Sequence, residues 1–129
     1  KVSEDLLAVA KEITDSFGTT VELAEKDFDT FTALAGSSPA YIALFIEALA
    51  KAGVKSGLSK QVALTIATQT VLATAENLNL GSDSPHDFID KVCSPGGTTI
   101  AGLMDLERTG LTHSVVSSID TTIAKAKKL

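Results

Sequence analysis

The chain has 129 residues, a net charge of −5 and a hydrophobic fraction of 44%. This length fits one domain, and the hydrophobic fraction excludes disorder. Trp is absent, while Tyr and Phe occur 1 and 5 times, so the apolar residues are mostly Ala, Leu, Val and Ile, which favours packed helices over an aromatic-rich β-sandwich. The negative charge argues against nucleic-acid binding, because a phosphate-binding surface needs clustered Lys and Arg.

The cysteine and lysine residues indicate the cellular compartment and argue against a metal site. The single Cys93 cannot form an internal disulfide, and no Cys-x-x-Cys or His-rich spacing suits a metal. We therefore expect a reducing, cytoplasmic compartment and no metal site. The basic cluster Lys125, Lys127 and Lys128 is typical of a solvated helix end. Because the chain opens on Lys1 without Met or a signal peptide, we expect a processed or engineered boundary and hence a fragment.

The first part of the chain predicts two short helices joined by an extended segment. Ser3 is a candidate cap for a helix with apolar residues at helical spacing, which Gly18 ends in a left-handed conformation. Residues 19–24 alternate like a strand too short to form a sheet, so we expect an extended connection. A second helix opens within residues 27–30, runs through Phe31 and Leu34, and ends at Gly36.

The next helix is apolar nearly all round. Ser37 or Ser38 caps it, Pro39 occupies its first turn, and Glu47 and Lys51 are its only charges from Tyr41 to Ala52. The apolar stretch falls short of the roughly 20 residues that span a bilayer, so we expect a buried helix and no membrane anchor. A chain of this size has few places to enclose such a helix, which indicates self-association.

Four more elements follow in the second half. Gly53 and Gly57 break the chain before Ser59, which caps a long helix rich in Ala and Thr that reaches about Leu78. A loop over residues 79–84 precedes a short helix from Pro85 to Val92. A helix to Arg108, ended by Gly110, and a last helix capped by Thr112 complete the chain.

One loop carries the residues suited to anion binding. Ser94-Pro95-Gly96-Gly97-Thr98-Thr99 combines hydroxyls with two glycines at a helix N-terminus, where free N–H groups and the helix dipole favour a carboxylate or phosphate. The loop lacks the Gly-x-x-x-x-Gly-Lys spacing of a nucleotide P-loop. Taken alone, it is also compatible with an ordinary turn and a Thr cap.

Two longer stretches carry a resemblance to a known family. Residues 90–103, read as Asp-Lys-Val-Cys-Ser-Pro-Gly-Gly-Thr-Thr-Ile-Ala-Gly-Leu, resemble the signature of pyrroline-5-carboxylate reductase, the last enzyme of proline biosynthesis. Residues 32–41, with Glu47-Ala48-Leu49-Ala50 and residues 53–58 after them, look like the long helix and turn of the same family. The resemblance covers nearly the whole chain in one register.

The resemblance implies a fold, a cofactor and an assembly. Family members have an N-terminal Rossmann domain for NADH or NADPH and an all-α, interlocked dimerisation domain like the C-terminal domain of 6-phosphogluconate dehydrogenase. Residues 1–129 match only this second, substrate-binding domain, and they contain no Gly-x-Gly-x-x-Gly motif after a strand. The family also implies a homodimer and, in many members, a decamer built as a pentamer of dimers.

The resemblance also implies roles for the residues of the loop. Ser94 and the backbone N–H groups around Gly96, Gly97 and Thr98 hold the substrate carboxylate, and Thr99 lies near the ring nitrogen as the catalytic hydroxyl. The reaction transfers hydride to an imine carbon, so a neutral hydroxyl can orient the nitrogen or relay its proton. The partner subunit's Rossmann domain presents the nicotinamide, which places the complete site between two chains, and the isolated domain is expected to be inactive.

Some residues depart from the family pattern. Ser38 stands where relatives have Gly, and Ser84 stands where they have His before Pro, with His86 shifted along. Two alternatives therefore stay open: a paralogue that reduces another cyclic imine or has lost catalysis, and a non-catalytic helical oligomerisation module. His86 and His113 are expected to be exposed, Cys93 to be a buried thiol, and Glu25, Asp27 and Asp29 to be solvated or capping charges. Asp105 and Glu107 are two residues apart, so on a helix they face away from each other and do not form a catalytic pair.

Overall fold

The computed structural model describes residues 2–128, so the boundary expected at Lys1 lies outside the described residues. The elements in chain order are α1 (Glu4–Asp15), the 3₁₀ turn η1 (Glu25–Asp27), α2 (Phe28–Phe31), the π-helical segment η2 (Thr32–Ser37), α3 (Ser38–Lys55), α4 (Lys60–Leu80), α5 (Pro85–Val92), α6 (Thr98–Arg108) and α7 (Leu111–Ala126). Residues 2–128 contain no strand. The predicted all-α class is therefore confirmed.

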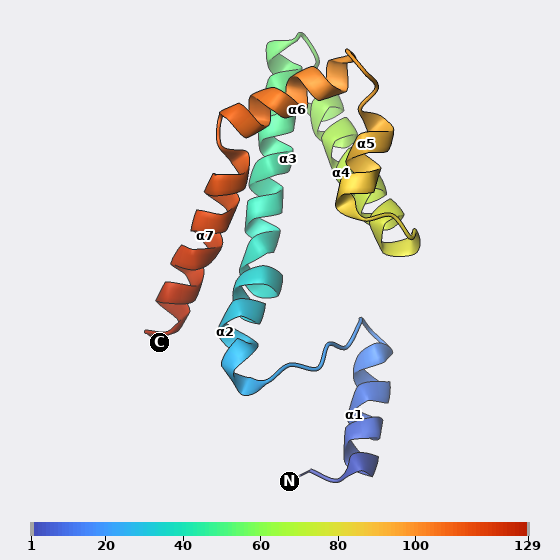
Figure 1. Ribbon diagram of the computed structural model, residues 1–129, viewed down its shortest axis with the longest axis vertical. Coiled ribbons are helices and arrows are strands. Elements are labelled where there is room, and N and C mark those ends of the chain that lie inside the picture. Colours follow the sequence, from blue (N-terminus) through green and yellow to red (C-terminus); the bar gives the residue numbers. More distant parts are fainter. Residues whose placement is uncertain (1, 129) are drawn as a thin grey trace.

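The helices form an open arrangement around α3 (Figure 1). α4 folds back along α3, while α7 contacts α2 and η2 at the opposite end of the α2–η2–α3 helix. α6 joins α5 to α7, and α1 stands apart at the end of the connection that follows it (Figure 1). Residues 19–24 have no regular structure, which confirms the predicted connection.

Two helix starts have the predicted caps, and a third lies at the predicted position with a cap that was not predicted. Ser3 accepts a hydrogen bond from the N–H of Leu6, and Ser59 accepts one from the N–H of Val62. Ser84 begins α5 in a capping box, with Pro85 in the first turn. These side chains satisfy backbone donors that the first helical turn leaves free, so the local sequence fixes where the helices begin.

Two predicted helix boundaries are wrong, the C-terminus of α1 and the N-terminus of α7. α1 ends at Ser16, whose hydroxyl donates to the Ile13 carbonyl, and Gly18 does not adopt a left-handed conformation. The hydroxyl already satisfies a terminal carbonyl, so no left-handed residue is needed there. Thr112 does not cap α7, because Gly110, at φ +85°, precedes the helix and its carbonyl accepts from the Ser114 N–H.

The predicted break at Gly36 is also wrong. α2, η2 and α3 form one helical stretch, and neither Ser37 nor Ser38 acts as an N-terminal cap. The Ser38 hydroxyl instead donates to the Ala33 carbonyl at 3.1 Å. Pro39 lacks an N–H and would disrupt a regular α-helical ladder, and the wider π turn accommodates it without ending the helix.

α3 and α4 pack through small residues. Ala50, Ala63 and Ala67 are buried between these elements. The predicted break at Gly53 is wrong, because α3 continues through this residue to Lys55. A Cβ at Gly53 would stand 3.0 Å from the Cβ of Ala63, so the glycine permits the close approach of the two helices. The chain turns instead at Gly57, whose φ of +101° suits glycine.

We expect Gly53→Val to lower the free energy of unfolding by about 1–3 kcal/mol, because its side chain would overlap Ala63 on α4. Gly102→Ala is the matched control, since a Cβ at this helical glycine meets nothing within 4 Å and alanine favours a helix. Thermal and urea unfolding of both variants measure the effect. Equal stability of Gly53→Val and the parent would contradict this packing.

The chain alone leaves most of its apolar surface uncovered. The only buried apolar residues among the described ones are Ala33, Ala50, Ala63 and Ala67. The surface of 10231 Å² exceeds by about 3,700 Å² the roughly 6,500 Å² typical of a compact monomer of 13.4 kDa. The helical stretch Glu25–Lys55 is long and apolar enough to span a membrane by composition, yet little of it is buried. One chain therefore does not enclose α3.

Candidate functional site

The loop between α5 and α6 is a compact turn that leads into a helix N-terminus. The Cys93 N–H donates to the Ile89 carbonyl at 2.9 Å as α5 ends, and the Gly97 N–H donates to the Ser94 carbonyl at 3.0 Å. Gly96 has a φ of +69°, in the left-handed region that favours glycine. Gly97 then precedes α6 without any side-chain cap.

This geometry defines which N–H groups are available to an anion. The Gly97 N–H is already engaged by Ser94, whereas the N–H groups of Thr98, Thr99 and Ile100 belong to the first turn of α6 and have no intrahelical carbonyl partner. Thr98 and Thr99 are the first two residues of α6. The helix dipole adds partial positive charge at the same end. A carboxylate is suited to this position.

The Ser94 side chain lies over the same turn. A Cβ added at Gly97 would overlap the Ser94 hydroxyl, so glycine is the residue that lets this hydroxyl lie against the helix end. Ser94, Thr98 and Thr99 are all exposed. The candidate binding residues within 94–99 thus lie together at one accessible end of α6.

An open apolar cavity of about 200 Å³ lies beside Thr99. Its lining comes from α4, α5, the start of the loop and α6: Thr74, Phe88, Ile89, Val92, Cys93, Thr99 and Leu103. The cavity brings Thr74, which no sequence pattern had singled out, to the site. Cys93 lines the cavity and is only half-buried, so the prediction of a buried thiol is wrong in its degree of burial.

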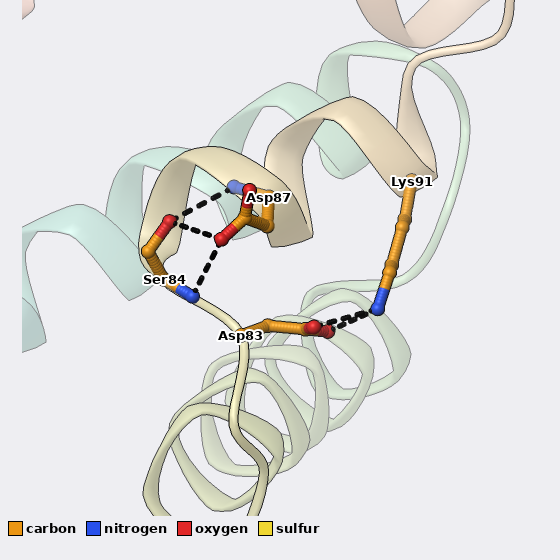
Figure 2. A network of polar contacts seen from close by, with 4 residues as sticks. All are labelled: Asp83, Ser84, Asp87 and Lys91. Atoms are coloured by element: carbon orange, nitrogen blue, oxygen red, sulfur yellow. Dashed lines mark hydrogen bonds and ion pairs between the residues drawn. The ribbon is translucent and has the colours of Figure 1, made fainter.

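Polar contacts hold both ends of α5 (Figure 2). The Ser84 N–H and hydroxyl both donate to Asp87 Oδ2, at 3.0 and 2.6 Å, and the Asp87 N–H donates to the Ser84 hydroxyl at 3.2 Å. Lys91 Nζ donates to both carboxylate oxygens of Asp83. Sequence reasoning identified the Pro85 start but missed Asp83 and Lys91, whose spacing of eight residues has no regular signature.

The capping box makes α5 sensitive to acid. The side-chain hydrogen bond from Ser84, and then its backbone N–H, hold the pKa of Asp87 below its ordinary value. The cap is therefore fully present above that ordinary value and is lost as pH falls through the lowered pKa. An NMR titration of the Asp87 carboxyl should give a midpoint that Ser84→Ala raises. Identical midpoints in the parent and the variant would contradict this account of the cap.

The residues expected to have ordinary roles do so. His86 and His113 are exposed. Asp105 pairs with Arg108 at 2.6 Å, which agrees with a solvated surface charge. Across residues 2–128, no group of three His, Cys, Asp or Glu side chains is placed to hold a metal ion.

The two stretches that resemble the reductase family lie apart within one chain. Residues 36–39 lie at the start of α3, whereas the Ser94 loop lies beyond α5, toward the opposite end of α3 (Figure 1). The Ser38 hydroxyl is satisfied within its own helix by the Ala33 carbonyl. Within one chain, Ser38 therefore contacts its own helix and not the Ser94 loop.

Comparison with known proteins assigns the family. The sequence model described as "Pyrroline-5-carboxylate reductase dimerisation" matches residues 25–129. The chain belongs to the pyrroline-5-carboxylate reductase family. It is 46% identical over 128 residues to the pyrroline-5-carboxylate reductase of Aquifex aeolicus, an alignment that covers 99% of this chain and 48% of that protein.

Solved structures agree with this pyrroline-5-carboxylate reductase assignment. The chain is similar to 1-pyrroline-5-carboxylate reductase from Streptococcus pyogenes, with 70% identity, a TM-score of 0.91, and coverage of 99% of this chain and 49% of that one. It is also similar to the Plasmodium falciparum pyrroline carboxylate reductase with NADP bound, with 34% identity, a TM-score of 0.89, and coverage of 99% and 52%. The chain spans about half the length of these relatives.

The described residues do not form a dinucleotide site. A Rossmann crevice requires parallel strands and a glycine-rich turn, and residues 2–128 hold neither a strand nor the Gly-x-Gly-x-x-Gly motif.

Proposed function

We propose that the protein to which this chain belongs reduces 1-pyrroline-5-carboxylate to L-proline with NADH or NADPH, in proline biosynthesis. Residues 1–129 act as its helical dimerisation and substrate-binding domain. The observation that carries the proposal is the Ser94 loop at the N-terminus of α6, in a chain that belongs to this reductase family. The substrate is a small anion with a carboxylate, which this helix end is suited to hold.

The dimer covers the apolar surface that one chain leaves exposed. α3 presents large apolar side chains to solvent, among them Leu44 at 67% exposure. If a second copy covered the whole excess of about 3,700 Å² per chain, the dimer would bury about 7,400 Å², more than the roughly 2,000–5,000 Å² of many obligate interfaces. A second copy, together with the rest of the polypeptide, covers this surface in place of a lipid bilayer. Five such dimers in a decamer are the higher assembly that the family suggests.

A protein environment also suits the charges of α3. Glu47 lies within the apolar helix and pairs with Lys60 of α4, and Lys51 stands 4.0 Å from the same carboxylate. These charges are too exposed and too central for a helix in hydrocarbon, where ionised groups are costly. We therefore assign the protein to the cytoplasm and not to a membrane.

The chemistry assigned to this chain is binding and orientation. The Ser94 hydroxyl and the free N–H groups of Thr98, Thr99 and Ile100 hold the substrate carboxylate, while Gly96 and Gly97 shape the turn that presents them. Reduction of a C=N bond needs a hydride, which the nicotinamide supplies, and a proton on nitrogen. The Thr99 hydroxyl lies near the ring nitrogen, where it orients the imine or relays that proton.

The complete site then lies between two chains. The Ser94 loop supplies the carboxylate end, and the partner subunit's Rossmann domain presents the nicotinamide. The isolated residues 1–129 are therefore inactive by themselves. Exposed Thr99, next to an open cavity, leaves room for a reacting ring to meet a group from outside the chain.

Oxidation of NADH and NADPH by the full-length protein with pyrroline-5-carboxylate tests the proposal. We expect turnover with stoichiometric L-proline from the full-length protein and none from residues 1–129. A folded full-length dimer that binds cofactor but forms no L-proline would contradict it, and so would turnover by residues 1–129 alone.

A further inference from the structure

An ion pair spans the whole of α5. Lys91 Nζ donates to Asp83 Oδ1 and Oδ2, at 2.6 Å in each case. Asp83 lies in the connection between α4 and α5, whereas Lys91 lies in the last turn of α5. Figure 2 shows the side chains of Lys91 and Asp83 pointing toward one another beside α5. The pair therefore ties the end of α5 to the segment that precedes its start.

The end of α5 determines where the carboxylate loop begins. Lys91 precedes Ser94 by three residues, and the Cys93 N–H bond to Ile89 is the last helical contact before the chain turns. The Ser94 carbonyl then accepts from the Gly97 N–H, and the Gly97 carbonyl accepts from the Ala101 N–H of α6. Successive backbone hydrogen bonds thus lead from the end of α5, where Lys91 lies, to the first turn of α6.

We propose that Asp83 and Lys91 are positioning residues for carboxylate binding, which act by fixing Ser94 against the N-terminus of α6. This inference rests on the proposed function. The side chains of Lys91 and Asp83 are 63% and 32% exposed, and ion pairs of this kind add little to overall stability. Their effect is on the placement of one loop and not on the folding of the domain.

Variants of the two residues distinguish a positioning role from direct attraction of the substrate carboxylate by Lys91. If Lys91 attracted the carboxylate through its charge, Asp83→Asn would free that charge and lower KM, while Lys91→Met would raise KM. A positioning pair gives the same sign for both variants, because each one breaks the same contact. The ammonium group is already committed to both oxygens of Asp83, which favours positioning.

Steady-state kinetics of the full-length protein test the proposal. We expect Asp83→Asn and Lys91→Met each to raise KM for pyrroline-5-carboxylate about two- to fivefold, with kcat unchanged, since an exposed ion pair is worth that much in an equilibrium. The charge-swapped double variant, Asp83→Lys with Lys91→Asp, should restore KM. Arg108→Met is the matched control, because it breaks the Asp105–Arg108 pair at the far end of α6 and should leave KM unchanged.

Hydrogen exchange gives a readout that does not depend on turnover. Without substrate, both single variants should accelerate hydrogen exchange of the Gly97 and Ala101 N–H groups, and the charge-swapped double variant should slow it again. If these changes appear but the parent protein does not reduce pyrroline-5-carboxylate, only the proposed function fails. Shifts of KM in opposite directions, or unchanged KM and unchanged exchange in both variants, would overturn the positioning role.

Discussion

Thr99→Val in the full-length protein is expected to lower kcat for pyrroline-5-carboxylate reduction about 100-fold, the size of effect typical of a group that assists proton transfer. Thr99 is exposed in the first turn of α6, beside both the free N–H groups and the apolar cavity. Valine preserves the shape of the side chain and removes only its hydroxyl. Steady-state kinetics and circular dichroism of the same samples measure turnover and folding together.

Thr109→Val serves as the matched control for Thr99→Val. It is the same substitution near the other end of α6, where the hydroxyl donates to the carbonyls of Asp105 and Leu106 and has no access to the loop. We expect this variant to keep its kcat. Unchanged kinetics in Thr99→Val would remove Thr99 from the mechanism.

Leu44→Asp is expected to abolish the dimer and, with it, the fold. Leu44 is 67% exposed on α3, and the proposed dimer covers this surface. An uncompensated carboxylate buried in that interface costs about 3–5 kcal/mol, which is a large part of the stability of a small domain. Sedimentation equilibrium and circular dichroism of the variant measure its mass and helix content.

The control for Leu44→Asp places the same carboxylate at a polar position of the same helix. Lys55→Asp lies in the exposed last turn of α3, where we expect the dimer to persist. A Leu44→Asp protein that stays dimeric and helical would mean that this face of α3 lies outside the interface.

The helices that the sequence predicted correctly are those with local signals. Ser3 and Ser59 cap their helices through contacts three residues away, a distance that a sequence pattern reveals, and Pro85 marks the start of α5. The capping box of Ser84 was not predicted. The continuous α2–η2–α3 helix was missed because Gly36 and Pro39 are ordinary helix breakers. Only the π turn, with the Ser38–Ala33 hydrogen bond, makes them compatible with a continuous helix.

Contacts between distant residues had no sequence signature. Tyr41 shares a hydrogen bond with Thr122, 81 residues away, and Glu47 pairs with Lys60 on the next helix and not only with Lys51. The intrahelical spacing of Glu47 and Lys51 is visible in the sequence, whereas the other two contacts depend on how α3 meets α7 and α4. Tertiary packing therefore decides which partner each side chain contacts.

The candidate site also combines features that the sequence reveals with features that depend on the fold. The hydroxyls and glycines of residues 94–99 were identifiable because a helix N-terminus needs them locally. The engaged Gly97 N–H, the Asp83–Lys91 pair and the contribution of Thr74 to the cavity depend on the folded turn and on α4. These features required the structure.

The mass of residues 1–129 in solution is the most direct test of the central claim, that this chain is a dimerisation domain whose apolar helices are covered by a second copy. Sedimentation equilibrium across a range of concentrations should give twice the mass of 13.4 kDa, with helix content retained. A stable, folded monomer would contradict the account, because the exposed surface of α3 would then need no partner.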